Sequence, residues 1–347
     1  MDFGGGDQIR FERAGKAGIV TLTRSDALNA LTHRMIRALG AALTAWETDP
    51  GVQVVILKAE GRAFCAGGDI MDVYRARQDG RQVNEFFADE YRLNARIDRF
   101  PKPYVSLIDG ICMGGGMGIS AHGSHRVMTE NAVFAMPEVG IGFFPDVGGS
   151  YVLPNLGSSF GMYLGLTGNR IGHGDALWSG VATHTVQAAF LPALVEEIAE
   201  SGDPGSELRE FFKAAPRKTD AASLQSIAKH FSLGSLRGIV ASLERAAASD
   251  AFAAETLATM RARSPTSLHV TFRALSAGST RSMAECMKME FRILNRMLES
   301  HDLYEGIRSA LVEKGSKPRW RPSRLEDVRT ADVDAYFAPL PDGDLAL

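Results

Sequence analysis

Two glycine-rich segments each follow a short apolar run and lead toward a candidate helix. Residues 61–69 (GRAFCAGGD) come after the run at 52–57, and residues 109–118 (DGICMGGGMG) come after the run at 104–108. N–H groups at the start of a helix have no partner within it, so both segments can present N–H groups to an oxygen that carries negative charge. Two such donors on one oxygen would stabilise the oxyanion that forms when a thioester carbonyl is attacked or enolised.

Two other interpretations of these glycines stay open at this point. One is a phosphate or dinucleotide loop, although the GxxxxGK[ST] pattern is missing and residues 114–118 fit GxGxxG only loosely. The other is that the glycines merely allow close packing of the backbone.

Two carboxylates share an otherwise apolar segment at residues 134–151 (FAMPEVGIGFFPDVGGSY), where Glu138 precedes Asp146 by eight positions. Burial and mutual repulsion disfavour charging both groups, so their pKa values should separate, which suits acid–base chemistry. The alternative for Asp146 is structural, because aspartate often caps a helix, here one that begins near Val147.

A third acid, Glu90, lies in a candidate helix at residues 83–99. Helical spacing places it on the same face as Phe86, Leu93, Asn94 and Ile97. A carboxylate on an apolar face either faces a pocket or pairs inside the protein, for instance with Arg126.

The elements that must position these residues alternate between strands and helices. Residues 8–24 read as a hairpin, residues 32–47 as an amphipathic helix with Thr32 as N-cap, and a short helix is expected at 117–121. After about residue 205 the strand-like runs disappear. We therefore predict an α/β protein with a core domain at 1–205 and a helical region at 206–347.

Composition excludes several classes of protein. The chain has 347 residues, 45% of them hydrophobic, and a formal net charge of −3, so neither global disorder nor nucleic-acid binding is indicated. No apolar run is long enough to span a membrane. The three cysteines form no CxxC pair, which predicts a reduced, cytoplasmic protein. His122 and His125 form HxxH without an evident third ligand, so no metal site is expected.

The two glycine segments, in this order, resemble the oxyanion-hole segments of the crotonase (enoyl-CoA hydratase/isomerase) superfamily. Residues 28–31 (LNAL) are similar to the early loop that touches coenzyme A in that family. The resemblance implies a spiral of ββα units with a C-terminal helical region and a coenzyme A thioester as substrate. It also implies an oxyanion hole formed by the N–H groups of Gly68 and Gly115.

The carboxylates distinguish branches of that superfamily. Enoyl-CoA hydratases use two glutamates around a water molecule, and this sequence has Gly118 at one of those positions and Glu138 at the other. Residues 134–151, with Glu138 and Asp146, are similar to the 3-hydroxyisobutyryl-CoA hydrolase branch, as are residues 164–168 (LGLTG). That branch has a substrate-contacting glutamate in a Glu-Tyr context that matches Glu90.

The resemblance thus implies hydrolysis of a short hydroxyacyl-CoA thioester, 3-hydroxyisobutyryl-CoA, in valine degradation. Glu138 would activate water or attack the carbonyl itself, Asp146 would orient the substrate hydroxyl, and Glu90 and Gly115 would contact the substrate. Coenzyme A is part of the substrate, and no further cofactor is expected. An enoyl-CoA hydratase, an enoyl-CoA isomerase and a non-catalytic acyl-CoA-binding scaffold stay open as alternatives. A homo-oligomer, trimer or hexamer, is implied by family resemblance.

Overall fold

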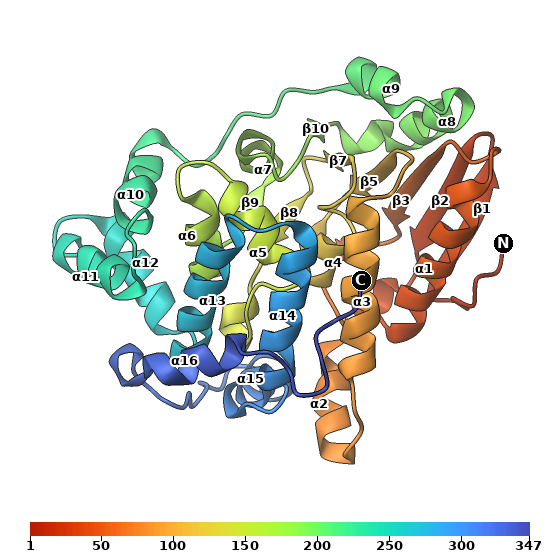
Figure 1. Cartoon of the computed structure of the whole chain (residues 1–347). Coiled ribbons are helices and arrows are strands. Elements are labelled where there is room, and N and C mark those ends of the chain that lie inside the picture. Colours follow the sequence, from red (N-terminus) through yellow and green to blue (C-terminus); the bar gives the residue numbers. More distant parts are fainter. The chain divides into compact units, whose positions relative to one another are not determined.

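The computed structural model describes residues 1–347, and the chain folds into two compact units (Figure 1). Unit 1 comprises Met1–Asp69, Glu85–Phe134 and Ile171–Lys218, and unit 2 comprises Ile70–Asn84, Ala135–Arg170 and Thr219–Leu347. Each unit is therefore assembled from three separate segments of the chain. No helix in either unit has both the length and the apolar character needed to cross a membrane.

A six-stranded sheet organises unit 1. Its strands lie in the order β1 (Ile9–Ala14), β2 (Ala17–Leu22), β3 (Val54–Ala59), β5 (Tyr104–Ile108), β7 (His125–Met128) and β10 (His184–Thr185) (Figure 1). β1 and β2 form the antiparallel hairpin that was predicted for residues 8–24, and the other neighbours are parallel. The α/β class expected from the sequence is confirmed.

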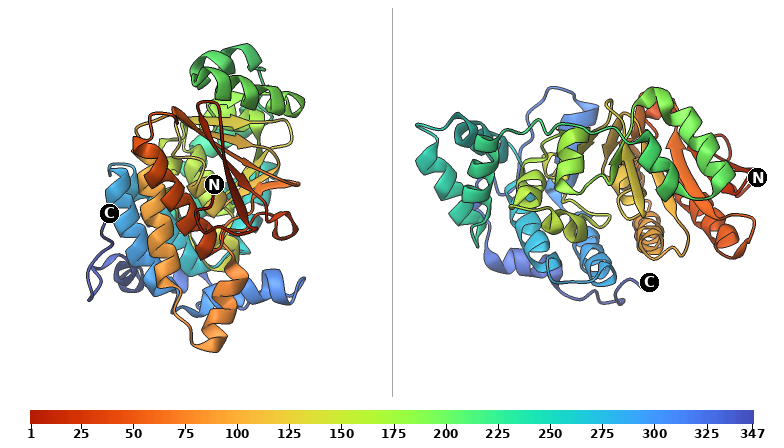
Figure 2. Two further views of the ribbon diagram at one scale, coloured as in Figure 1. Left: turned by 90° about the vertical axis from the view of Figure 1, so that its right-hand side faces the viewer. Right: turned by 90° about the horizontal axis from the view of Figure 1, so that it is seen from above.

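Helices cover both faces of this sheet, which explains why its central strands are continuous apolar runs. Ala17 and Ile19 of β2 pack in a core with α8 (Leu191–Ser201) and α9 (Pro204–Phe211). Gly18 faces the other way, toward α1 (His33–Thr48), where a Cβ atom would lie 2.7 Å from the ring of Trp46. Figure 2 shows α8 and α9 beside these strands.

Helix α1 begins where the sequence predicts. Thr32 has extended backbone, and its hydroxyl accepts a hydrogen bond from the N–H of Met35 at 3.2 Å, as an N-cap should.

A smaller sheet carries the two glycine segments. It contains β4 (Ala63–Cys65), β6 (Ile111–Met113), β8 (Val133–Ala135) and β9 (Ile171–Gly172). β4 and β6 are parallel neighbours with Cys65 opposite Cys112. Unit 1 is completed by α3 (Asn84–Asp98), α4 (Gly115–Gly118) and α7 (His173–Ser179).

The helix predicted at 117–121 is wrong in its bounds, because the chain turns earlier than expected. Gly114, with φ +50°, directly precedes the first residue of α4. The turn therefore makes Gly115 itself the first residue of the helix.

Unit 2 is built mainly from helices. They are α2 (Ile70–Asp79), α5 (Gly149–Val152), α6 (Phe160–Thr167), α10 (Ala221–Phe231), α11 (Leu236–Ala246), α12 (Ala251–Arg261), α13 (Pro265–Gly278), α14 (Met283–Met297), α15 (His301–Ile307) and α16 (Thr330–Phe337). The helices from α10 to α15 each begin after a Ser or Asp whose side chain accepts a hydrogen bond from a first-turn N–H. Capping therefore defines where each of them starts.

Shorter turns connect these helices and strands. The 3-10 turns are Ser25–Ala27, Glu138–Ile141, Leu153–Asn155, Ala188–Phe190 and Leu325–Asp327, and a π-helix spans Arg308–Val312. No strand follows β10, as the change of sequence texture near residue 205 predicts. The division into domains at 1–205 and 206–347 stays a prediction, because the two units interleave along the chain and are defined by contacts.

Candidate active site

Gly68 and Gly115 lie side by side in unit 1. A Cβ atom built on Gly115 would lie 3.2 Å from the backbone nitrogen of Gly68. Leu31 forms a backbone bridge with the first segment: its N–H donates to the carbonyl of Gly67 (2.8 Å), and its carbonyl accepts from the N–H of Asp69 (2.9 Å). No main-chain hydrogen bond involves the N–H of Gly68 or of Gly115. The structure thus brings the two predicted donors close together, as binding of one oxygen atom by both would require.

Glycine is required where the two segments approach each other. Gly67 has φ +114°, a conformation that residues with a side chain rarely adopt. A Cβ atom on Gly116 would lie 2.4 Å from the carbonyl oxygen of Cys65. Close backbone packing was one interpretation of these glycines. The structure shows such packing beside the two N–H groups that make no main-chain hydrogen bond.

Helix α3 presents two side chains to these glycines. The ring of Phe86 lies 3.4 Å from the position of a Cβ atom on Gly68, and Oε1 of Glu90 lies 2.6 Å from that of a Cβ atom on Gly115. Phe86 and Glu90 are four residues apart, so they lie on one face of the helix. The structure therefore places Glu90 beside Gly115, and Phe86 beside Gly68.

Glu90 is buried, as its helical spacing predicts, with 2% of its surface exposed. The suggested partner Arg126 directs its guanidinium elsewhere. Its three nitrogens donate to the carbonyls of Val181 (2.8 Å), Gly123 (3.0 Å) and Gly180 (3.2 Å). The contact with Gly115 therefore favours a pocket role for Glu90 over an ion pair with Arg126.

Asn29 secures the first glycine segment. Its side-chain nitrogen donates to the carbonyls of Glu60 (2.9 Å) and Ala63 (2.8 Å), and its own backbone has φ +55°. Residues 28–31, which resemble a coenzyme A loop, therefore also hold the 60–69 segment in place.

In unit 2, Glu138 begins the 3-10 turn Glu138–Ile141 and is buried, with 6% of its surface exposed. Its Oε2 atom has no hydrogen-bond partner. The turn packs closely on α15. A Cβ atom on Gly142 would lie 2.1 Å from the carbonyl oxygen of Asp302, and a Cβ atom on Gly306 would lie 2.2 Å from the backbone of Ile141. The backbone that carries Glu138 is thus held against a helix, while one carboxyl oxygen is left available.

Electrostatics make Glu138 a strong proton acceptor once it is ionised. Burial raises its pKa well above the usual range, and the nearby charges of Asp146 and Glu290 raise it further. A carboxyl group of raised pKa is suited to take up a proton near neutral pH.

Asp146 is also buried, with 5% of its surface exposed. The helix that follows begins at Gly149 and not near Val147, and its N-cap residue is Gly148. The helix-cap interpretation of Asp146 required an earlier start, so the structure weakens it. The negative charge of Asp146 raises the pKa of Glu138, so the two carboxyls interact within unit 2.

Sequence reasoning missed Glu290, a third buried carboxyl in unit 2. It lies on α14 and accepts hydrogen bonds from the N–H of Gly148 and from both the N–H and the hydroxyl of Ser150. The signal was present, because Glu290 lies on the buried face of its helix with Met283, Cys286, Met287, Ile293 and Leu294. The spacing argument that identified Glu90 would have found it.

No group of three or more His, Cys, Asp or Glu side chains is arranged to hold a metal ion. His125 stacks on His184 with ring centroids 5.9 Å apart. The thiols of Cys65 and Cys112 are buried, and burial raises the pKa of each, of Cys112 to about 12. These cysteines are therefore poor nucleophiles.

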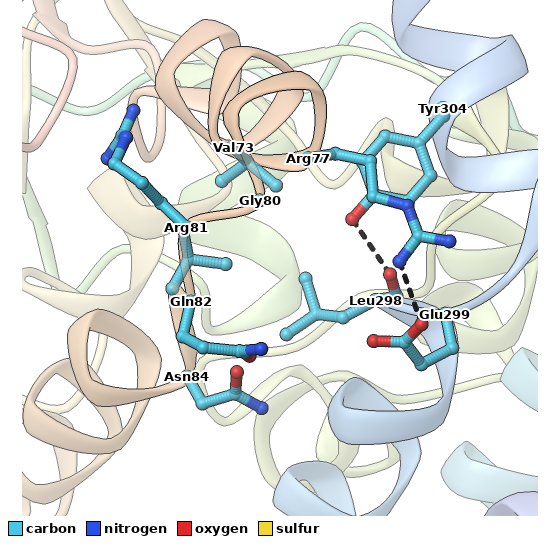
Figure 3. A pocket seen from close by; sticks show the side chains of 10 residues that line it. Val73, Arg77, Gly80, Arg81, Gln82, Asn84, Leu298, Glu299 and Tyr304 are labelled. Carbon is cyan, nitrogen blue, oxygen red and sulfur yellow. Dashed lines mark hydrogen bonds and ion pairs between the residues drawn. The ribbon is translucent and has the colours of Figure 1, made fainter.

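A cavity of about 180 Å³ in unit 2 lies between α2 and the start of α15 (Figure 3). Its two arginines are already paired: Arg77 with Glu299 at 2.7 Å and Arg81 with Asp72 at 2.8 Å. Arg77 also lies over the ring of Tyr304. Because acids neutralise both cations, the cavity offers no free charge for a phosphate.

The chain is similar to known proteins over nearly its whole length. A family model described as enoyl-CoA hydratase/isomerase matches residues 17–337. The chain is 42% identical to 3-hydroxyisobutyryl-CoA hydrolase, mitochondrial, of Danio rerio, over 99% of this chain and 92% of that protein. It is 38% identical to the protein of the same name from Homo sapiens, over 98% and 90%.

Two solved structures are similar over nearly their whole length, each with a TM-score of 0.91 and 39% identity. One is a carnitinyl-CoA dehydratase from Mycobacterium thermoresistibile, with 97% of this chain and 98% of that chain covered. The other is an enoyl-CoA hydratase from Rhodobacter sphaeroides, with 98% and 100% covered. The crotonase fold implied by the sequence resemblance is confirmed.

Proposed function

This chain belongs to the enoyl-CoA hydratase/isomerase family, and we propose that within it the protein hydrolyses 3-hydroxyisobutyryl-CoA to 3-hydroxyisobutyrate and coenzyme A. The vertebrate relatives that carry this activity in their names are about 40% identical over almost the entire chain. The same likeness supports a place in valine degradation.

The observation that carries the proposal is the set of buried carboxyls. The position of one hydratase glutamate is occupied by Gly118, which has no side chain, whereas Glu138 and Asp146 are both buried in unit 2. Water addition to an enoyl group relies on two glutamates in the hydratases, and only one is present here. A base and a second acid on one segment fit attack on a thioester carbonyl instead.

In the proposed reaction the N–H groups of Gly68 and Gly115 bind the thioester oxygen as it becomes an oxyanion. Each such donor typically contributes about 10²–10³ in rate. Glu138 either removes a proton from water as the new C–O bond forms, or attacks the carbonyl itself to give a mixed anhydride. In both cases the C–S bond breaks as the oxyanion collapses, and the sulfur leaves as a thiol with a proton that water supplies. In the second case water then hydrolyses the anhydride, which releases the acid and restores the carboxylate of Glu138. Asp146 orients the substrate hydroxyl, and Glu90 contacts the acyl group.

Hydration is the second candidate function. Its support is specific, because the two solved structures at 39% identity are named as a dehydratase and a hydratase. Hydration adds water across a carbon–carbon double bond and releases no thiol, so the two reactions give different products.

One experiment separates them. The purified chain is incubated with 3-hydroxyisobutyryl-CoA and, separately, with crotonyl-CoA, while free thiol and enoyl absorbance are recorded. We expect thiol release from the first ester and hydration of the second that is slower by orders of magnitude. Hydration of crotonyl-CoA at about 10 s⁻¹ or more, without thiol release, would assign the chain to the hydratases.

Three further properties belong to the proposal. The reaction as written needs no metal or redox cofactor, because acids and backbone donors supply each step.

A trimer or hexamer is proposed from family resemblance, and light scattering of the purified protein tests it. The cytoplasmic location stays a prediction: the relatives are named mitochondrial proteins, and fractionation of the source cells decides between the compartments.

A further inference from the structure

The carboxyl group of Glu290 is fully buried and occupied on both oxygens. Oε2 accepts from the N–H of Gly148 at 2.9 Å, and Oε1 accepts from the N–H and the hydroxyl of Ser150 at 2.9 and 2.5 Å. Hydrogen bonds from N–H and O–H groups to one carboxyl are the strong kind, and here they all reach a single short turn. Glu290 therefore connects α14 to the residues directly after Asp146.

That turn has a conformation that it would not adopt by itself. Val147 has φ +49°, and Gly148 has φ +90°. A β-branched residue in the left-handed region is a conformational outlier, and such strain persists only where surrounding structure enforces it. The three hydrogen bonds of Glu290 begin at the residue immediately after Val147, so they are placed to enforce it.

The helices around the turn leave it little freedom. A Cβ atom on Gly278, the last residue of α13, would lie 1.9 Å from the carbonyl oxygen of Ser150. Helix α14 starts in a capping box between Ser282 and Glu285, and its buried face includes Met287 and Ile293. Glu290 thus projects from a well-anchored helix.

The charge of Glu290 suits this position. Burial raises its pKa to about 8, with the charge of Asp146 adding to the rise and the hydrogen bonds opposing it. All three donors point at acceptor oxygens, so the hydrogen bonds favour the ionised carboxylate and limit the rise that burial causes in its pKa.

We propose that Glu290 is a positioning residue: its three hydrogen bonds hold residues 147–150 and thereby fix the side chain of Asp146. The inference deepens the proposed function and rests on it, since Asp146 there orients the hydroxyl of the substrate.

The test compares Glu290→Ala and Glu290→Gln in the full chain. We measure kcat and KM with 3-hydroxyisobutyryl-CoA and with isobutyryl-CoA, which lacks the hydroxyl, and hydrogen exchange at the amides of Gly148 and Ser150. Glu290→Ala should accelerate exchange at both amides. It should also lower kcat/KM for the hydroxyacyl ester by about 10-fold to 100-fold through misplacement of Asp146, with a smaller loss for isobutyryl-CoA.

Two further variants separate positioning from general instability. Val147→Gly removes the strain, since glycine adopts this conformation freely, and added to Glu290→Ala it should restore part of the lost kcat/KM. Asp175→Asn removes another buried acid that accepts a backbone N–H, in unit 1, and should leave kcat/KM and both amides of the turn unchanged. If Glu290→Ala does not fold, Glu290→Gln, which keeps the size of the side chain, gives the same measurements.

Exchange at Gly148 and Ser150 that matches wild type overturns the proposal, and so does kcat/KM within about two-fold of wild type. An equal loss with both esters also contradicts it, because the effect would then not pass through Asp146. The proposed function fails separately: if wild type releases no thiol from the hydroxyacyl ester, the amide exchange still decides whether Glu290 holds the turn.

Discussion

The two units contribute different kinds of group to the proposed chemistry. In unit 1, Gly68 and Gly115 would act through their backbone N–H groups, and their lack of a side chain lets the two segments approach each other. In unit 2, Glu138 and Asp146 would act through buried, ionisable side chains, and burial raises the pKa of Glu138. Activity should therefore fall when an atom is added to a glycine of unit 1. It should also fall when a carboxyl of unit 2 loses its charge but keeps its shape.

The strongest way to break this comparison is Glu138→Gln, which keeps the size of the side chain and removes its basicity. We expect thioester hydrolysis to fall by about 10²–10⁴-fold, the range for losing general acid–base catalysis. Initial rates of thiol release at saturating substrate measure the effect. Glu244→Gln, an exposed site in the same unit, is the control and should match wild type. A Glu138→Gln variant with half the wild-type activity would refute the assignment.

Gly115→Ala tests whether activity falls when one methyl group is added to a glycine of unit 1. The new methyl group would lie 2.6 Å from Oε1 of Glu90 and 3.1 Å from Leu31, so the loop or Glu90 must move. We expect the rate to fall by about 10²-fold, as when one oxyanion donor is lost.

Gly40→Ala is the matched control for that change, because no atom lies within 4 Å of the position of its added methyl group on α1. It should keep full activity and gain about 0.5–1 kcal/mol in free energy of unfolding. Full activity of a folded Gly115→Ala variant would show that the thioester oxygen binds elsewhere.

The pH dependence of kcat/KM tests the raised pKa of Glu138. Because the pKa of Glu138 is raised, its ionised form appears only above the usual range for glutamate, and kcat/KM should rise with pH through that raised value. Asp146→Asn removes a neighbouring negative charge, which makes ionisation of Glu138 easier. The acidic limb of kcat/KM should therefore move to lower pH in that variant, even though its maximum falls. An unshifted limb would mean that the profile reports another group.

The smallest expected effect concerns Asn94, one helical turn from Glu90. Asn94 is fully buried, and neither amide atom has a hydrogen-bond partner, unlike the occupied carboxyl of Glu290. Asn94→Leu keeps the branched shape of the side chain, removes both unpaired polar atoms and should raise the free energy of unfolding by about 1–3 kcal/mol. Urea denaturation measures it. A loss of stability would show that the amide is hydrogen-bonded in solution, for example to buried water.

Local patterns predicted much of the fold and part of the site. The hairpin, the N-cap at Thr32 and the burial of Glu90 each depend on residues a few positions apart, and all three are confirmed. The short strand β4 was missed, since three residues within a loop-like segment become a strand only by pairing with β6.

The support of the candidate site could not be predicted in the same way. Glu290 contacts Gly148 and Ser150, which are 142 and 140 residues away in sequence. No spacing rule connects such positions. The burial of Glu290 was accessible from its helical face, but the turn that it holds was not. The roles of Gly68, Gly115, Glu138 and Asp146 stay predictions that the variants above test.

The ion pair between Arg77 of α2 and Glu299 joins residues 222 positions apart, which has a consequence for biosynthesis. A ribosome adding about 5–20 residues per second delivers Glu299 roughly 11–44 s after Arg77. During that interval α2 also lacks α15, which contacts it in the finished protein, so we expect its buried residues Val73 and Ala76 to be less covered. Chaperones that bind nascent apolar segments should therefore engage this region. Premature stop codons before α15 should give products that proteases remove rather than shortened enzymes.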